Sequence, residues 1–209
     1  MTRVKTIGGG VKVWWLLLAF LSGFALAMWA EELILSWKDD RLQFSAPRLH
    51  FLSGKPLERL KDGSQVPYNF QITLWSGNRN HVFRRIAEQF VVSYDLWEER
   101  FSVSKASGRR ATKSHMVAAA AEAWCLDQMP LDTSGLAGAE LFWARLEIRA
   151  EDGKEPPPFG RGNISPSGIN LTSLIEIFSR PAAAGQSHWA VDAGPLTLDE
   201  LKRGHGRGS

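Results

Sequence analysis

The sequence predicts a β-rich α+β fold: an antiparallel sheet or sandwich-like meander, one covering helix at 115–129 and a second helix near 169–180. Three observations predict it. Apolar and polar residues alternate from Tyr68 to Leu74, which is typical of a half-buried antiparallel strand. Turn-forming residues separate several such stretches. One Ala-rich run lacks the alternation and stops at Pro130, as a helix does.

Residues 1–30 have the pattern of an export signal. Three basic residues and no acidic one accompany an apolar run over 13–30. Ala25 and Ala27 fit the small-x-small pattern of a cleavage site, which predicts Met28 as the new N-terminus. The alternative is an uncleaved anchor, because the run is nearly long enough to cross a bilayer. We therefore expect an exported protein, either periplasmic or anchored to the outer face of the cytoplasmic membrane.

Composition restricts the partners and the redox chemistry. Residues 31–209 carry as many basic as acidic residues, 22 of each, although the whole chain has a net charge of +3. A nucleic-acid partner would need a strong positive field, so we expect none. The single cysteine, Cys125, cannot form an internal disulfide. It lies on an apolar helical stripe, which predicts a buried and unreactive thiol.

The first predicted elements of the domain are a strand pair and a short helix. Within 31–51, two alternating stretches flank a turn at Asp39 and Asp40. A helix is predicted over 56–61, and Gly63 lies just beyond its end.

A meander is predicted next. The stretch 82–94 fits a strand or a helix, and the β-branched and aromatic residues over 90–94 favour a strand. A further strand is predicted around Phe101 and Val103. Ser114 is the predicted cap of the helix at 115–129.

Alternation returns over 139–150, which predicts another strand. Its inward residues are Phe142, Ala144, Leu146 and Ile148, and its outward residues are Arg145, Glu147 and Arg149.

We expect residues 31–180 to form one globular domain, with a loop over 151–168, and residues 181–209 to form a flexible tail. Within the tail, Thr197 and Glu200 have the spacing of a capping box. So short a helix is marginal alone and should form only by docking, either onto the domain itself or onto another protein. The candidate residues for docking a partner are Trp189, Leu196, Leu198 and Leu201.

Catalytic motifs are missing from the sequence. It has no nucleophile elbow, zinc-binding helix, phosphate loop or paired C-x-x-C. The five histidines never show the spacing that places two metal ligands on one helix face. Adjacent acidic pairs lie in predicted turns, without the hydrophobic pocket that raises the pKa of a general acid. We therefore expect no enzyme activity, no metal and no cofactor.

The most concentrated polar feature is a basic group at a turn between two predicted strands: Arg79, His81, Arg84 and Arg85. One interpretation is a solvated turn, since charge commonly protects sheet edges. The alternative is a contact with an anionic group, such as a lipid headgroup. Five tryptophans lie in or beside predicted elements, where core packing is expected: Trp37, Trp75, Trp97, Trp124 and Trp143.

The order of segments resembles the exported bacterial family catalogued as domain of unknown function 4390. The matching stretches are Asp40–Ser45, Leu57–Gly63, Val66–Phe70, Val92–Leu96 and Ala144–Arg149. The resemblance covers about residues 31–150. That family has no established activity, so the resemblance implies location and fold and assigns no site residue.

These observations lead to an expected function. We expect a non-catalytic cell-envelope module that binds an envelope protein or a membrane surface, as an accessory to a membrane-bound regulatory system. The alternatives are a small-ligand or lipid-binding envelope protein, and a hydrolase with a site assembled from distant residues. An exposed apolar patch would favour a partner, an apolar cavity would favour ligand carriage, and a deep polar cleft would favour the enzyme.

Overall fold

A computed structural model describes residues 32–77, 79–107, 110–151, 178–179 and 185–205. The chain divides into two units, 1–31 and 32–209, and all described residues belong to the second. The predicted export signal thus lies outside the described residues. Within the described ranges, no helix has both the length and the apolar character needed to cross a membrane.

A small antiparallel sheet contains the predicted strand pair. Strand β1 (Ile34–Lys38) pairs with β2 (Arg41–Ser45), and β2 pairs with the short β7 (Leu131–Asp132). Asp39 and Asp40 both have positive φ, at 51° and 60°. Two-residue hairpin turns that follow the twist of the strands require this conformation, and Asp tolerates it. The strand pair and its turn are therefore confirmed.

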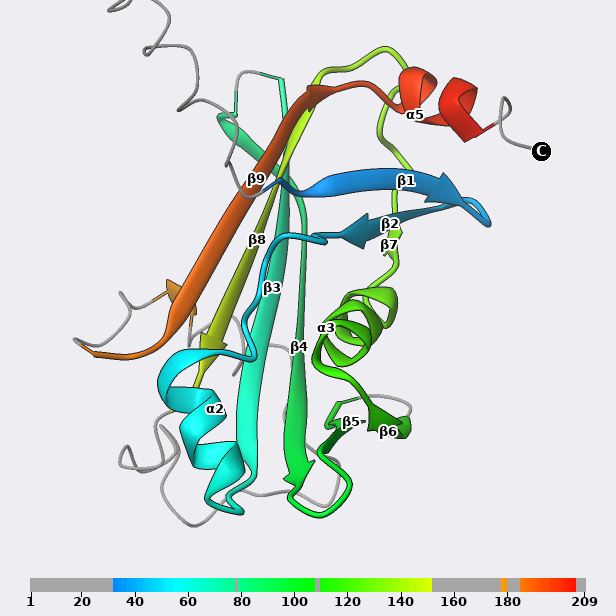
Figure 1. The fold of residues 1–209 in the computed structure, drawn as a ribbon. Helices are drawn as coiled ribbons and strands as arrows, with labels where there is room; N and C mark the ends of the chain where they lie inside the picture. Colours follow the sequence, from blue (N-terminus) through cyan, green and yellow to red (C-terminus); the bar gives the residue numbers. More distant parts are fainter. Residues whose placement is uncertain (1–31, 78, 108–109, 152–177, 180–184, 206–209) are drawn as a thin grey trace, which may run out of the picture. The chain divides into compact units, whose positions relative to one another are not determined.

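The larger sheet has six strands, and every neighbouring pair is antiparallel (Figure 1). They are β3 (Val66–Ser76), β4 (His81–Asp95), β5 (Arg100–Lys105), β6 (Thr112–Met116), β8 (Phe142–Ala150) and β9 (His188–Leu196). Their spatial order is β6-β5-β4-β3-β8-β9. The predicted meander corresponds to β3, β4 and β5, and the stretch 82–94 is a strand.

Three helices are described: α2 (Gly54–Lys61), α3 (Ala118–Asp127) and α5 (Leu198–His205). Figure 1 shows α2 and α3 on the same face of the large sheet, so the β-rich α+β prediction with a covering helix is confirmed. The predicted start of that helix is wrong. Residues 112–116 pair with β5 as an edge strand, and Val117 precedes the helix without a side-chain cap. Of the predicted helix near 169–180, only 178–179 are described, and they are helical.

One apolar cluster forms the core between the covered face of the large sheet, the helices α2 and α3, and the small sheet. The side chains of Tyr68, Phe70, Ile72 and Leu74 on β3 are completely buried in it. Cys125 of α3 is buried there too, as predicted. Burial raises the pKa of its thiol, and the nearby charge of Glu122 adds to this shift. The thiol is therefore protonated and unreactive at neutral pH.

The opposite face of the large sheet, called the second face below, is polar but largely buried. Asn69, Gln71 and Thr73 on β3 are at most 4 % exposed, and Gln89 and Arg149 on the adjacent strands are buried beside them. The expectation of a half-buried β3 is therefore wrong. The alternation predicted the strand correctly, but the polar residues of β3 are buried as well as the apolar ones.

The C-terminal segment is part of the domain. Strand β9 pairs with β8 over seven residue pairs, and α5 follows it directly. The expected flexible tail is wrong for residues 188–205. Alternation in this segment is weak, because small residues and Pro195 interrupt it, and pairing with a strand more than 35 residues away cannot be seen in local pattern.

Candidate functional site

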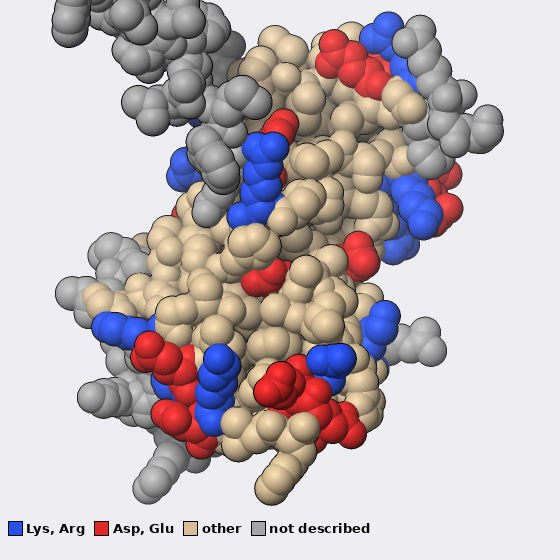
Figure 2. Space-filling view, in the orientation of Figure 1, with Lys and Arg blue, Asp and Glu red and all other residues tan. Residues whose placement is uncertain are grey.

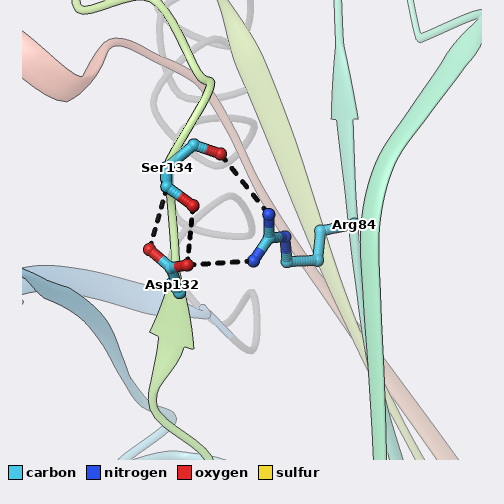
Figure 3. Close-up of polar contacts among 3 residues, drawn as sticks. All are labelled: Arg84, Asp132 and Ser134. Carbon is cyan, nitrogen blue, oxygen red and sulfur yellow. Dashed lines mark hydrogen bonds and ion pairs between the residues drawn. The ribbon is translucent and has the colours of Figure 1, made fainter.

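The four predicted basic residues do not form one site. Successive side chains on a strand point to opposite faces, so Arg84 and Arg85 separate. Arg84 lies on the core side and donates to Asp132 (Nη1 to Oδ2, 3.2 Å) and to the carbonyl oxygen of Ser134 (3.4 Å), as Figure 3 shows. Hydrogen bonds from Ser134 lower the pKa of Asp132, and Arg84 contributes to the shift. Arg84 thus connects β4 to the loop after β7.

The other residues of this group have different surroundings. Arg79, in the turn before β4, places its guanidinium 5.3 Å from the centre of the Trp143 ring. His81 is exposed at the start of β4. Strand alternation therefore divides Arg79, His81, Arg84 and Arg85 between different surroundings, and the anion contact expected of them stays a prediction.

Arg85 shares the second face with another arginine that is distant in sequence, Arg145. Thr73 of β3 pairs with Arg85 on β4 and with Arg145 on β8, so the three side chains lie in one row across the strands. Arg79 lies near the end of this row, since it contributes to lowering the pKa of Asp192, the partner of Arg145.

The acidic residue of this row is Asp192, and it binds only one of the arginines, Arg145. Asp192 of β9 accepts two hydrogen bonds from Arg145, at 2.7 Å and 2.8 Å. These bonds lower the pKa of Asp192 and raise that of Arg145. Arg85 is different. Its Nε is buried and has no hydrogen-bond partner.

Further along the second face, polar side chains bind one another. Gln89 donates to Asn69 (3.0 Å) and to the carboxylate of Glu151 (2.9 Å), and Asn69 also donates to Glu151 (3.0 Å). Gln71 donates to Glu147 (3.3 Å). Glu147 and Glu151 thus act as hydrogen-bond acceptors for the amide side chains of β3 and β4.

A buried carboxylate in the core was missed by the sequence analysis. Glu122 of α3 accepts from the backbone N–H of Leu52 (2.9 Å) and contacts His50 (3.1 Å). Nearby, the Tyr68 hydroxyl is buried without a hydrogen-bond partner. Burial raises the pKa of this hydroxyl most, and the charge of Glu122 raises it further. The sequence feature that indicates this contact is a single Glu in the middle of an Ala-rich helix. Its contacts hold the 50–52 segment against α3, which is a structural role.

The candidate docking residues pack on the protein itself. Trp189 lies 6.4 Å from both Phe51 and Tyr68, measured between ring centres, and Leu198 is 2 % exposed. Leu196 and Leu201 also pack against the core. The predicted capping box is confirmed: Glu200 accepts from the backbone of Thr197 at 3.2 Å, and the Thr197 hydroxyl accepts from Glu200 at 3.3 Å. Of the two docking alternatives, the structure shows the intramolecular one.

Trp97 is the aromatic residue that the sequence analysis misplaced. It lies in the four-residue turn between β4 and β5 and is 97 % exposed, whereas core packing was expected. Leu96 beside it is 55 % exposed. Val117 is 52 % exposed at the same end of the sheet, since β6 ends with Met116 paired to Phe101 of β5. The position of Trp97 in a turn is the sequence feature that indicates its exposure, because turns lie at the protein surface.

The backbone of this turn is well supported. Asp95 accepts from the N–H groups of Trp97 (2.8 Å) and Glu98 (3.0 Å), and these bonds lower the pKa of its carboxyl. Glu99 closes the turn at φ 52°. Glu98 is paired with His115 of β6 at 2.5 Å. We call residues 96–99 the hairpin tip. It lies at the lower end of the sheet in Figure 1, where Figure 2 shows charged side chains of both signs.

No family model, curated protein or solved structure matches the chain. The family resemblance noted from the sequence therefore stays a prediction. In the described part of the chain, no group of three or more His, Cys, Asp or Glu side chains is arranged to hold a metal ion.

Proposed function

We propose that the protein is a non-catalytic binding module of the cell envelope that docks a partner protein through the hairpin tip. The observation that carries the proposal is the exposure of Trp97, at 97 %. Large aromatic side chains bury 150–250 Å² when they are enclosed, and tryptophan is among the residues most enriched at the energetic centres of protein interfaces. Because the Trp97 indole is almost fully exposed, the free energy of burying it is gained only when a partner covers it.

The turn also holds the indole in a defined position. Asp95 fixes the backbone of Trp97, and the Glu98–His115 pair ties the tip to β6. A preorganised loop loses little conformational entropy on binding, which favours affinity. Leu96 and Val117 extend the apolar surface around the indole. This arrangement supports binding of a partner by a small anchor.

The charges around the tip favour a protein over a membrane surface. Asp95, Glu98 and Glu99 carry three carboxylates, while Arg100 is the basic residue that follows them. An anionic bilayer repels such a surface, whereas a protein pocket with a basic rim complements it. The buried carboxylates described above accept hydrogen bonds from backbone or amide groups, which favours binding over a hydrolase.

A site-specific photo-crosslink tests the proposal. Trp97 is replaced by a photo-crosslinking amino acid in the full-length protein, expressed in its native cells. The matched control carries the same group at Val82, which is 43 % exposed at the other end of β4. We expect a discrete protein adduct from position 97 that is reduced by Glu98→Lys and Glu99→Lys, and none from position 82.

Two results would contradict the proposal. Equal adducts at positions 97 and 82 would show that the tip has no special affinity. Adducts with lipid alone at position 97 would replace the protein partner by a membrane contact.

A further inference from the structure

We propose that the protein forms a symmetric dimer in which strand β9 pairs with β9 of a second copy of the chain. The proposal does not depend on the hairpin tip, which connects β4 and β5 on the other side of β3. Among the described strands, β9 pairs only with β8 and therefore ends the large sheet on one side (Figure 1). A free edge strand carries unpaired N–H and C=O groups, which are a template for a further strand.

The backbone groups on this free edge follow from the pairing of β9 with β8. The Ala150 N–H donates to the carbonyl oxygen of Ser187 (3.0 Å), so Ser187 turns its backbone groups toward β8. This direction alternates along an antiparallel strand. The N–H and C=O groups of His188, Ala190 and Asp192 therefore point away from β8. All three residues are exposed, so a second strand can reach them.

The two edges of the large sheet differ in how well they are protected. Strand β6 has five residues, contains Lys113, pairs irregularly with β5, and includes His115 at φ 59°. Short length, lysine and irregular register all hinder the addition of a strand to an edge. Strand β9 has nine residues without Lys or Arg, and its register with β8 is regular from His188 to Ala193, before Pro195. The β9 edge lacks the protection of the opposite edge, which indicates a strand partner.

A second copy of β9 fits this edge because its outward residues are self-complementary. In a two-fold symmetric pair centred on Ala190, His188 of each copy lies opposite Asp192 of the other. An imidazole donor then faces a carboxylate, which can accept a further hydrogen bond besides the two from Arg145. Ala190 faces its own counterpart, and no bulky side chain separates the strands there. The backbone and the side chains thus favour the same arrangement.

Neighbouring symmetric registers are less favourable. Centring the pair on Asp192 places two carboxylates opposite each other, which is destabilising. Centring it on Val191 pairs Asp192 with Ala190 and leaves His188 without an acceptor. Centring it on His188 or Trp189 pairs few residues, because β9 begins at His188. The expected register therefore places Ala190 on the two-fold axis, where a single substitution changes both copies at one point.

Charge substitution at Ala190 tests the dimer. The mass of the full-length protein in solution is measured by light scattering after size-exclusion chromatography, and we expect twice the mass of one chain. Ala190→Lys and Ala190→Glu each place like charges opposite each other across the axis, so each should weaken dimerisation at least tenfold. An equimolar mixture of the two variants should form mixed dimers, because opposite charges then face each other.

The matched control is Ser114→Lys on the opposite edge strand, β6. It adds the same charge at an exposed edge position and should keep the dimer. Trp97→Ala should keep it as well, which separates this inference from the proposed function. Circular dichroism spectra of all variants verify that they are folded. A monomeric wild-type protein, equal dissociation by the two lysine substitutions, dissociation by Trp97→Ala, or a mixture that stays monomeric would overturn the inference.

Thiol crosslinking in native cells gives a second measurement that does not depend on charge. The natural chain has one cysteine, Cys125, and it is buried, so Ala190→Cys supplies an exposed thiol without a competing one. A short bismaleimide should join two copies through this position. Ser114→Cys is the control and should give no dimer above the wild-type background. Equal yields of covalent dimer from the two positions would contradict pairing through β9.

Discussion

The sequence predicts that Trp97 packs in the core and that Trp189 lies in a flexible tail, whereas in the structure Trp97 is exposed and Trp189 is packed. Trp97 lies in a region dense in predicted strands, yet it is 97 % exposed. Trp189 lies in a segment rich in small and polar residues, yet its ring packs against Phe51 and Tyr68. Each has one apolar neighbour and one charged or polar neighbour: Leu96 and Glu98 for Trp97, and Ala190 and His188 for Trp189. Their local sequence therefore does not separate the exposed one from the packed one.

The difference comes from what each backbone pairs with. Trp189 is on β9, which pairs with β8, and the register turns its side chain toward the core. Trp97 is in a turn, where no neighbouring strand supplies a surface to cover it. The C-terminal segment contributes stability, and the hairpin tip leaves its aromatic residue available. The predictions below test this contrast.

Removal of residues 186–209 should have the largest effect. It exposes the edge of β8 and uncovers Phe51 and Tyr68, so we expect the melting temperature to fall by more than about 10 °C, or cooperative unfolding to be lost. Circular dichroism melts measure it. Trp97→Ala is the comparison and should change the melting temperature by less than about 2 °C, because it removes an exposed side chain. A deletion variant as stable as the full chain would eliminate the contrast.

Leu198→Ala should destabilise the protein by about 2–4 kcal/mol, since it leaves a cavity beneath α5. Leu198 is 2 % exposed. The same substitution at Leu96, which is 55 % exposed in the hairpin tip, should cost less than about 0.5 kcal/mol. Urea unfolding of the two variants gives both values. Similar losses for the two leucines would contradict the assignment of stability to the C-terminal segment.

Gly194→Ala should cost roughly 1–3 kcal/mol from backbone strain, and more if the contact does not relax. Gly194 has φ +111°, and a Cβ there would lie 2.8 Å from the carbonyl oxygen of Phe142. Gly77 is the control near the same end of β8, where its N–H donates to the carbonyl oxygen of Leu141. Its φ is +64° and a Cβ there would meet no atom within 4 Å. Gly77→Ala should cost about 1–2 kcal/mol. Chemical denaturation compares them, and a more harmful Gly77→Ala would show that β9 is held loosely.

The smallest expected effect is a pH dependence at His188, on the second face of β9. Burial, and then the charge of Arg149, lower the pKa of His188 below its usual 6.5. The unfolded chain therefore takes up the proton at a higher pH than the folded protein does. His188 favours folding above pH 6.5, and this contribution is lost as the pH falls through the region below 6.5.

His188→Gln tests that sign, because glutamine cannot take up the proton. The stability difference between wild type and variant should shift in favour of the variant between pH 7.5 and pH 5. Solvent screening keeps the shift below about 1 kcal/mol. Denaturation at both pH values measures it. A shift in the opposite direction would mean that protonated His188 is stabilised by the acidic residues of this face.

Much of the fold could be predicted from local pattern. The alternation over 68–74 identified β3, and the alternate residues Phe142, Ala144, Leu146 and Ile148 of β8 are buried in the core as expected. The capping box of Thr197 and Glu200 was correct because it depends on residues three positions apart. Such features arise from interactions within a few residues, which a sequence displays directly.

The candidate site was predicted less well. The basic residues were found, but they were grouped by sequence proximity, and strand alternation sends Arg84 and Arg85 to opposite faces. Arg145 could not be added to the group, because its place beside Thr73 depends on the β3–β8 register. The predicted helix began at 115, within edge strand β6, because the residues of this strand show no alternation of apolar side chains.

The sequence by itself determined the strand pair within 31–51, the meander of β3, β4 and β5, strand β8, and the burial of the single cysteine. Tertiary structure alone decided which strands are neighbours. That choice places Arg85 and Arg145 on either side of Thr73, packs Trp189 against Phe51 and Tyr68, and leaves Trp97 exposed. The physical reason is that hydrogen bonding and side-chain periodicity act over a few residues. Strand order is set instead by the burial of apolar surface contributed by the whole chain.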